Sequence, residues 1–173
     1  MSKTKNEYYR GEIFAMSGAS YQHNQIASTL VRDIGTHLKG KGCNIFGSDL
    51  RIYTQQKSFY TYPDAVIICG DPSFIDNEFD DTVLNPTIIF EILSPSTEDF
   101  DKTIKFDFYK NIPTLKQYVL LDSQKIMVQI FTKQADNTWL IQQHDLLEDQ
   151  WELTAIQYKS TIKELYDGVQ FKK

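Results

Sequence analysis

The chain has 173 residues, a length that suits one folded core better than two. We therefore predict a single domain over residues 1–173. Hydrophobic residues make up 41% of the sequence and charged residues 24%, a balance that excludes an intrinsically disordered chain. The net charge of −5 weighs mildly against nonspecific nucleic-acid binding, although acidic metal ligands and local basic patches are both compatible with it.

Neither a targeting segment nor a cysteine motif stands out in the sequence. No apolar run approaches the roughly 20 residues of a membrane helix, and the first residues lack the apolar stretch of a secretory signal. We expect a cytoplasmic protein that does not enter a membrane. Cys43 and Cys69 stand far apart, without CxxC spacing or nearby histidines. This pattern predicts two buried thiols rather than a disulfide or a zinc site.

The first part of the chain predicts a strand followed by a long helix. Residues 11–16 form a short apolar run that is typical of a strand. From Tyr21 to about Lys39, apolar residues recur at three- and four-residue spacing, which predicts an amphipathic helix. Ser20 is a suitable N-cap for this helix, and Gly40 is a suitable end.

Beyond Gly42 the pattern changes to strands. Residues 44–54, 59–70 and 86–93 are β-prone, whereas the polar stretch 71–85 predicts a surface loop with one short helical turn. A second helix is expected over about 98–111, and strands follow at 117–123 and 125–133, with more strand and a short final helix at the end. The order helix, three strands, helix, strand predicts an α/β fold of the α+β kind, with helices packed on a mixed sheet.

Two acids occupy unusual positions in these strands. Asp64 opens a hydrophobic strand, and Glu91 lies inside another. An unpaired buried carboxylate costs several kcal/mol, so each acid needs a cation, a set of donors or a proton. Asp64 could instead cap its strand, and Glu91 could pair with a lysine or arginine. If the strands are neighbours, the two acids predict a site for Mg²⁺ or Mn²⁺.

Three stretches of the chain resemble one known family. Residues 8–30, 62–70 and 86–122 match, in order and spacing, the Uma2 family, which was formerly a domain of unknown function. Uma2 proteins belong to the PD-(D/E)xK nuclease superfamily. The resemblance implies a restriction endonuclease-like αβββαβ core, with extra strands at both ends of the chain. It also implies that Pro63-Asp64 matches the PD of the motif and that Glu91 matches its second acid.

The lysine of the motif departs from its usual place. The motif has lysine two residues after the second acid, where this sequence has Leu93. In Uma2-like sequences the lysine is found on the following helix, where Lys102 and Lys105 are the candidates. At about 100° per residue, Lys105 lies beside the apolar stripe of that helix and Lys102 points nearly opposite. We therefore expect Lys105 to act on the attacking water and on the charge of the transition state.

Two further residues lie in the matching N-terminal stretch. An early acid often adds a metal ligand in related nuclease folds, which makes Glu12 a candidate. His23 lies on the apolar face of the first helix, where a histidine supports a ligand or is simply a hydrogen-bonded core residue. The second of these interpretations of His23 is the more common one.

The leading hypothesis is a metal-dependent endonuclease that hydrolyses phosphodiester bonds in DNA. Asp64 and Glu91 would hold Mg²⁺ or Mn²⁺, and Lys105 would assist the water. A second hypothesis is a binding or assembly module that keeps the nuclease fold without turnover, which the acidic charge and the displaced lysine favour. Hydrolysis of nucleotides or RNA is a third. We expect a homodimer, because two-fold dimers are the commonest assemblies.

Overall fold

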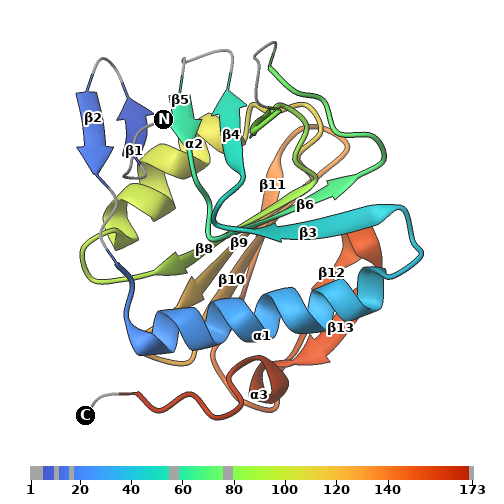
Figure 1. The fold of residues 1–173 in the computed structure, drawn as a ribbon. Coiled ribbons are helices and arrows are strands. Elements are labelled where there is room, and N and C mark those ends of the chain that lie inside the picture. The colour runs from blue at the N-terminus through green and yellow to red at the C-terminus, as the bar shows by residue number, and fades with distance from the viewer. Residues whose placement is uncertain (1–5, 10–11, 16–17, 55–58, 76–79, 172–173) are drawn as a thin grey trace.

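A six-stranded mixed sheet forms the centre of the protein (Figure 1). The computed structural model describes the chain except for residues 1–5, 10–11, 16–17, 55–58, 76–79 and 172–173. The strand order is β11-β10-β9-β8-β6-β3, in which β8 and β9 are parallel and the other neighbours antiparallel. The strands are β3 (Cys43–Gly47), β6 (Ala65–Cys69), β8 (Ile88–Leu93), β9 (Gln117–Asp122), β10 (Val128–Lys133) and β11 (Trp139–His144).

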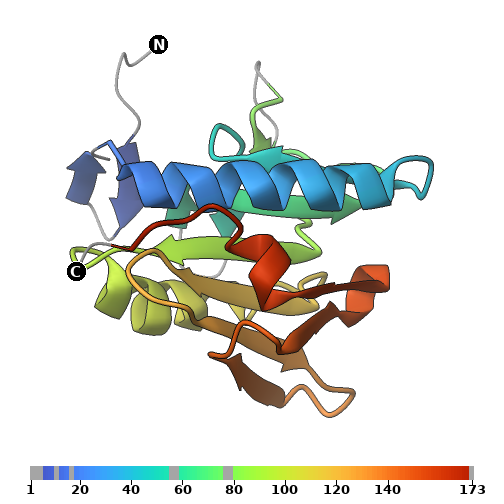
Figure 2. The same ribbon diagram turned by 90° about the horizontal axis from the view of Figure 1, so that it is seen from below.

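Helix α1 (Tyr21–Leu38) covers one face of this sheet, as the apolar spacing predicts. Its buried side chains pack against alternate residues of β6, β8 and β9. The side chain of Ser20 caps the helix by accepting a hydrogen bond from the His23 amide at 3.2 Å. The C-terminal elements lie beside α1 on the same face (Figure 2). They are β12 (Gln150–Leu153), a 3₁₀ turn η3 (Thr154–Ile156), β13 (Tyr158–Thr161) and α3 (Ile162–Leu165).

The opposite face is covered by a second sheet and a helix. The five-stranded sheet has the order β2-β1-β5-β4-β7, and a π-helical segment η2 (Phe100–Lys105) leads into α2 (Phe106–Tyr109). Ile89 and Leu93 of β8 belong to the core on this face. Because side chains alternate along a strand, Glu91 between them faces the same layer. The strands are β1 (Asn6–Tyr9), β2 (Glu12–Ala15), β4 (Arg51–Thr54), β5 (Phe59–Thr61) and β7 (Thr82–Val83).

The predicted strands are placed correctly but are shorter than expected. Residues 44–54 divide into β3 and β4, and residues 59–70 into β5 and β6, so that β4 and β5 leave the central sheet for the second one. Pro63 lies at the second break, where it has no amide hydrogen to continue a ladder. The predicted loop 71–85 holds β7 in place of a helical turn, within its described residues.

The second predicted helix exists, but its buried face differs from the expected stripe. Ile104 is 36% exposed, whereas Asp101, Lys105 and Tyr109 are buried together with Phe108. The prediction assumed α-helical geometry throughout, and the wider π-helical turn over Phe100–Lys105 rotates the buried face. A charged pair therefore occupies the inward side of this segment.

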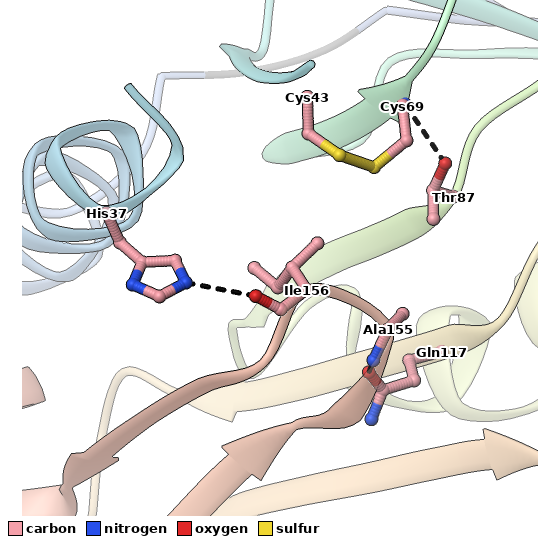
Figure 3. The surroundings of a disulfide bond; sticks show 7 residues. All are labelled: His37, Cys43, Cys69, Thr87, Gln117, Ala155 and Ile156. Carbon is pink, nitrogen blue, oxygen red and sulfur yellow. Dashed lines mark hydrogen bonds between the residues drawn. A yellow bond between two sulfur atoms is a disulfide. The ribbon is translucent and has the colours of Figure 1, made fainter. Parts of the chain in front are cut away.

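Cys43 and Cys69 form a disulfide, so the prediction of two thiols was wrong (Figure 3). The two residues are direct partners in the antiparallel register of β3 and β6, which brings their side chains together. The amide of Cys69 donates to Thr87 Oγ1 at 3.1 Å, next to the start of β8. The prediction used the distance along the chain, which does not show which residues face each other across a sheet. Among the described residues, no helix is long and apolar enough to cross a membrane.

Candidate active site

Lys105 lies at the centre of a buried cluster of carboxylates. Its Nζ is 3.2 Å from Glu7 Oε1, 3.2 Å from Glu91 Oε1 and 3.1 Å from Asp101 Oδ1. These acids come from β1, β8 and η2, so three separate elements converge on one ammonium group. Burial by itself lowers the pKa of Lys105, but the three carboxylates outweigh burial and raise that pKa well above its usual value. Lys105 is therefore a fixed cation.

Glu91 is the most deeply placed of these acids. Its Oε1 accepts a hydrogen bond from the Tyr109 hydroxyl at 3.0 Å, in addition to the contact with Lys105. Burial raises the pKa of Glu91 well above its usual value, and the charge of Lys105 opposes this effect only in part. Positive charge close to Glu91 therefore favours its ionised form.

Glu7 joins the cluster from the second sheet. Its Oε1 accepts a hydrogen bond from the Thr61 hydroxyl at 2.6 Å, and the hydroxyls of Thr61 and Tyr109 lie 3.1 Å apart. These groups link Glu7, through Thr61 and Tyr109, to Glu91. The resulting network fixes the side chains around Lys105 in one arrangement.

Asp64 lies directly before β6 and is held at both of its oxygens. Oδ2 accepts a hydrogen bond from the Ile92 amide at 2.7 Å, and Oδ1 lies 3.2 Å from His23 Nε2. His23 therefore supports Asp64 from α1, with Nε2 as the donor in the tautomer that this contact requires. Its Nδ1 is buried and has no hydrogen-bond partner among the described residues.

One cavity of about 490 Å³ connects these groups. The charged side chains in its lining are the carboxylates of Glu7, Asp64, Glu91 and Asp101, and the ammonium of Lys105. Carboxylates thus outnumber cations by four to one in the described lining, which favours the entry of a further cation. Within the same described residues, no group of three or more His, Cys, Asp and Glu side chains has the geometry of a complete metal site.

The structure brings most of the predicted residues to this cavity. Asp64, Glu91, Lys105 and His23 all line it. Glu12 begins β2, the outermost strand of the second sheet, and its side chain lies outside the described residues.

Sequence reasoning missed three members of the site, namely Glu7, Asp101 and Tyr109. Asp101 and Tyr109 lie four residues before and after Lys105, a helical spacing that could have indicated them. Glu7 carries no such signal, because its partners come from distant parts of the chain.

The family-model comparison matches almost the whole of this chain. The model of Uma2, described as "Putative restriction endonuclease", matches residues 1–162. The chain belongs to the Uma2 family. In this Uma2 protein Leu93, at the usual position of the motif lysine, is buried in the core on the α2 face, and Lys105 enters the cavity from η2.

Two relatives from Synechocystis sp. (strain PCC 6803) support the assignment to Uma2. The chain is 38% identical to "Uncharacterized protein sll1609" over 137 residues, covering 79% of this chain and 77% of the relative. It is 34% identical to "Uncharacterized protein slr1290" over 169 residues, covering 98% and 87%.

A solved structure shares the fold of this Uma2 protein. The crystal structure of "a putative nuclease belonging to DUF820" from Anabaena variabilis superposes with a TM-score of 0.77 at 19% identity. The match covers 98% of this chain and 93% of that one. The predicted fold class, a mixed α+β fold of the nuclease type, is thereby confirmed.

Proposed function

We propose that this protein is a metal-dependent endonuclease that hydrolyses phosphodiester bonds in DNA. The observation that carries the proposal is the convergence of Asp64, Glu91 and Lys105 on one cavity, from β6, β8 and η2. The description of the Uma2 family supports a nuclease-like activity, and the Anabaena nuclease structure shares the fold. Fold alone does not assign an activity, so the proposal depends on the chemistry of these residues.

The donor set of the cavity fits a hard divalent cation. Asp64 and Glu91 would hold Mg²⁺ or Mn²⁺, because carboxylate oxygens are the ligands that these ions prefer. The surplus of carboxylates over cations in the lining supports this assignment. Such a cation, when bound, activates water and stabilises negative charge on a phosphate group.

The remaining residues have roles that follow from their contacts. Lys105 is a cation with fixed position, so it stabilises negative charge that develops on the phosphate and orients a water. Asp101 and Tyr109 hold Lys105 and Glu91 in place, and His23 orients Asp64. Lys102 pairs with Glu98 at the partly exposed side of η2 and is absent from the described lining of the cavity.

A second candidate function is a binding or assembly module without turnover. The observation that favours it is the enclosure of Lys105 by three carboxylates, at 3.1 to 3.2 Å, which leaves this lysine strongly engaged inside the protein. The acidic net charge of −5 favours it as well. The two candidates differ in whether cleavage occurs when a divalent cation is present.

The test is cleavage of supercoiled plasmid, linear duplex, single-stranded DNA and RNA, with Mg²⁺ and separately with Mn²⁺. We expect the wild type to nick DNA only with metal, Glu91→Gln to abolish nicking, and Lys105→Met to reduce it at least a hundredfold, a magnitude typical of losing one charge-stabilising group. Lys102→Met is the matched control and should retain activity. Cleavage of RNA alone would change the assigned substrate.

A parallel measurement separates an inactive fold from an unsuitable substrate. Mg²⁺ or Mn²⁺ should raise the melting temperature of the wild type by binding the folded state, and Asp64→Asn should lose most of that increase. Asparagine keeps a side-chain oxygen that accepts a hydrogen bond from the Ile92 amide. This variant therefore preserves the hydrogen bond that positions residue 64. No cleavage together with no metal-dependent stabilisation would support the binding module.

A further inference from the structure

Strand β11 leaves one edge of the central sheet open. Along its six residues it pairs with β10, from Trp139 opposite Lys133 to His144 opposite Val128. In the part of the chain that the structure describes, no strand pairs with its other side. The outward backbone groups of such a strand are a template for pairing with another chain.

The sequence of β11 lacks the features that usually protect a free edge. The strand reads WLIQQH, with no Lys, Arg, Asp, Glu or Pro. Soluble proteins commonly guard exposed edges with charged residues, proline, bulges or very short strands. A regular six-residue uncharged edge therefore indicates a strand that is covered in the working form of the protein.

Exposed apolar side chains gather at the same place. The described residues include eight exposed large hydrophobic side chains, and four of them are Leu140, Ile141, Leu146 and Leu147, in β11 and the turn after it. Leu140 and Ile141 are 52% and 53% exposed. In Figure 2, α1 and the C-terminal elements lie in front of the sheet and do not extend over this edge. At the opposite edge, β3 carries one such side chain, Phe46. Concentrated apolar exposure of this kind marks interaction sites.

We infer that β11 pairs with β11 of a second copy of this chain, in antiparallel orientation about a two-fold axis perpendicular to the sheet. Such an axis keeps each side chain on its own face of the sheet, so one residue lies opposite its own copy, with the axis midway between the two. With the axis at Ile141, this residue meets itself, Leu140 meets Gln142, and Trp139 meets Gln143.

The charges around the strand are compatible with this pairing. Each copy has a net charge of −5, which opposes association in general. In the two-fold register, however, Asp145 falls opposite Asn137, and Asp136 falls opposite Leu146. No two like charges face each other along the pairing. A second copy of this chain is thus a suitable partner, because the pairing needs only β11 from each copy.

The register of the central sheet fixes how far apart the two cavities lie in this dimer. Glu91 is opposite Leu120 on β9, which is opposite Gln129 on β10, which is opposite Gln143 on β11. Seven strand spacings of about 4.8 Å separate β8 from its copy, with an offset of four residues along the strands. The two Glu91 Cα atoms then lie about 36 Å apart in an untwisted sheet. The inferred dimer does not depend on the proposed function. Only a role for this spacing in binding a substrate would depend on that function.

The test is sedimentation of the full chain across about a hundredfold range of concentration. We expect the wild type to sediment as a dimer of twice 20.1 kDa. Ile141→Glu places a carboxylate opposite its own copy, and it should weaken the dimer at least tenfold. Phe46→Glu is the matched control, with the same change of charge on the exposed edge strand β3, and should dimerise like the wild type. Circular dichroism of each variant checks that it is folded.

A covalent variant tests the register directly. Ile141→Cys should form a disulfide-linked dimer under mild oxidation, whereas Phe46→Cys should not, because β3 lies outside the proposed contact. Cys43 and Cys69 are paired with each other, so neither offers a free thiol. A monomeric wild type at every concentration, or an Ile141→Glu dimer as tight as the wild type, would overturn the inference. So would loss of the dimer in Phe46→Glu alone, which would assign the contact to β3.

Discussion

Replacing Lys105 with methionine removes the cation from the centre of the buried carboxylate cluster. The Nζ atom makes contacts of 3.1 to 3.2 Å with Glu7, Glu91 and Asp101, and all four side chains are buried. Each contact corresponds to a gross attraction of about 5 kcal/mol at an effective dielectric constant of about 20. Desolvation offsets most of this energy, and removing one partner of a buried ion pair typically costs about 3–5 kcal/mol. We expect that loss for Lys105→Met at pH 7.5.

Urea unfolding followed by circular dichroism measures this loss. With a slope of about 2 kcal/mol per molar urea, the midpoint of Lys105→Met should fall by about 2 M. Lys102→Met is the control, since its partly exposed pair with Glu98 contributes at most about 1 kcal/mol. A loss below about 1 kcal/mol in Lys105→Met would refute the reasoning, because three uncompensated buried carboxylates could not then be present.

The pH dependence of the free energy of unfolding tests the same buried cluster. In the wild type the pKa of Lys105 is raised, so its contribution is fully present below the unfolded value of about 10.4 and is lost as the pH rises through the folded value. In Lys105→Met, the buried carboxylates take up protons as the pH falls. Burial raises the pKa of Glu91 and Asp101, and the variant lacks the lysine charge that opposes this effect. The difference in the free energy of unfolding between wild type and variant should therefore narrow as the pH falls through these raised values, and it should be smallest below the unfolded value of about 4.

Two further predictions concern other parts of the fold. The disulfide closes a separation of 26 residues, so its loss in the Cys43→Ser, Cys69→Ser variant should lower the free energy of unfolding by about 3.5 kcal/mol on a chain-entropy estimate. Thermal melts with and without reductant check this value, and an unchanged melting temperature would contradict it. The Tyr166 hydroxyl donates to buried carbonyls, and burial raises its pKa, so wild-type stability should decline as the pH rises from about 10 towards the folded pKa. Tyr166→Phe should show a shallower decline in alkaline urea titrations, and an equal slope would exclude this tyrosine as a contributor.

The central layer of the fold could be predicted because its patterns are long. The 18-residue helix α1 repeats its apolar spacing over several turns, and β8 and β9 are mainly apolar strands with both faces buried. The second sheet is different, because its strands have two to four residues and too few alternations to define a period. Their pairing depends on contacts between distant segments, which local patterns do not contain.

The candidate site divides in the same way. Asp64 and Glu91 stand out because acids are rare in apolar strands, and Lys105 follows from helical geometry and the family resemblance. Glu7 lies in a short strand among polar residues, where an acid is ordinary. The π-helical turn of η2 could not be predicted either, because nothing in the residues 98–105 distinguishes it from an α-helix. The same limit applied to Cys43 and Cys69, whose facing positions depend on the register of β3 and β6.

The hydrogen bond between Asp64 and the Ile92 amide fixes the position of Asp64 relative to Glu91 of β8. The ladder of β6 and β8 ends with Ala65 opposite Phe90, and Asp64 Oδ2 then accepts from the second residue beyond that pair. Glu91 lies between Phe90 and Ile92, so its neighbour carries the contact that fixes Asp64. The spacing of the two acids is thus preorganised by the backbone. An ion that bound both acids, as proposed, would meet side chains that have already lost their rotational freedom, so little of its binding energy would go into ordering them.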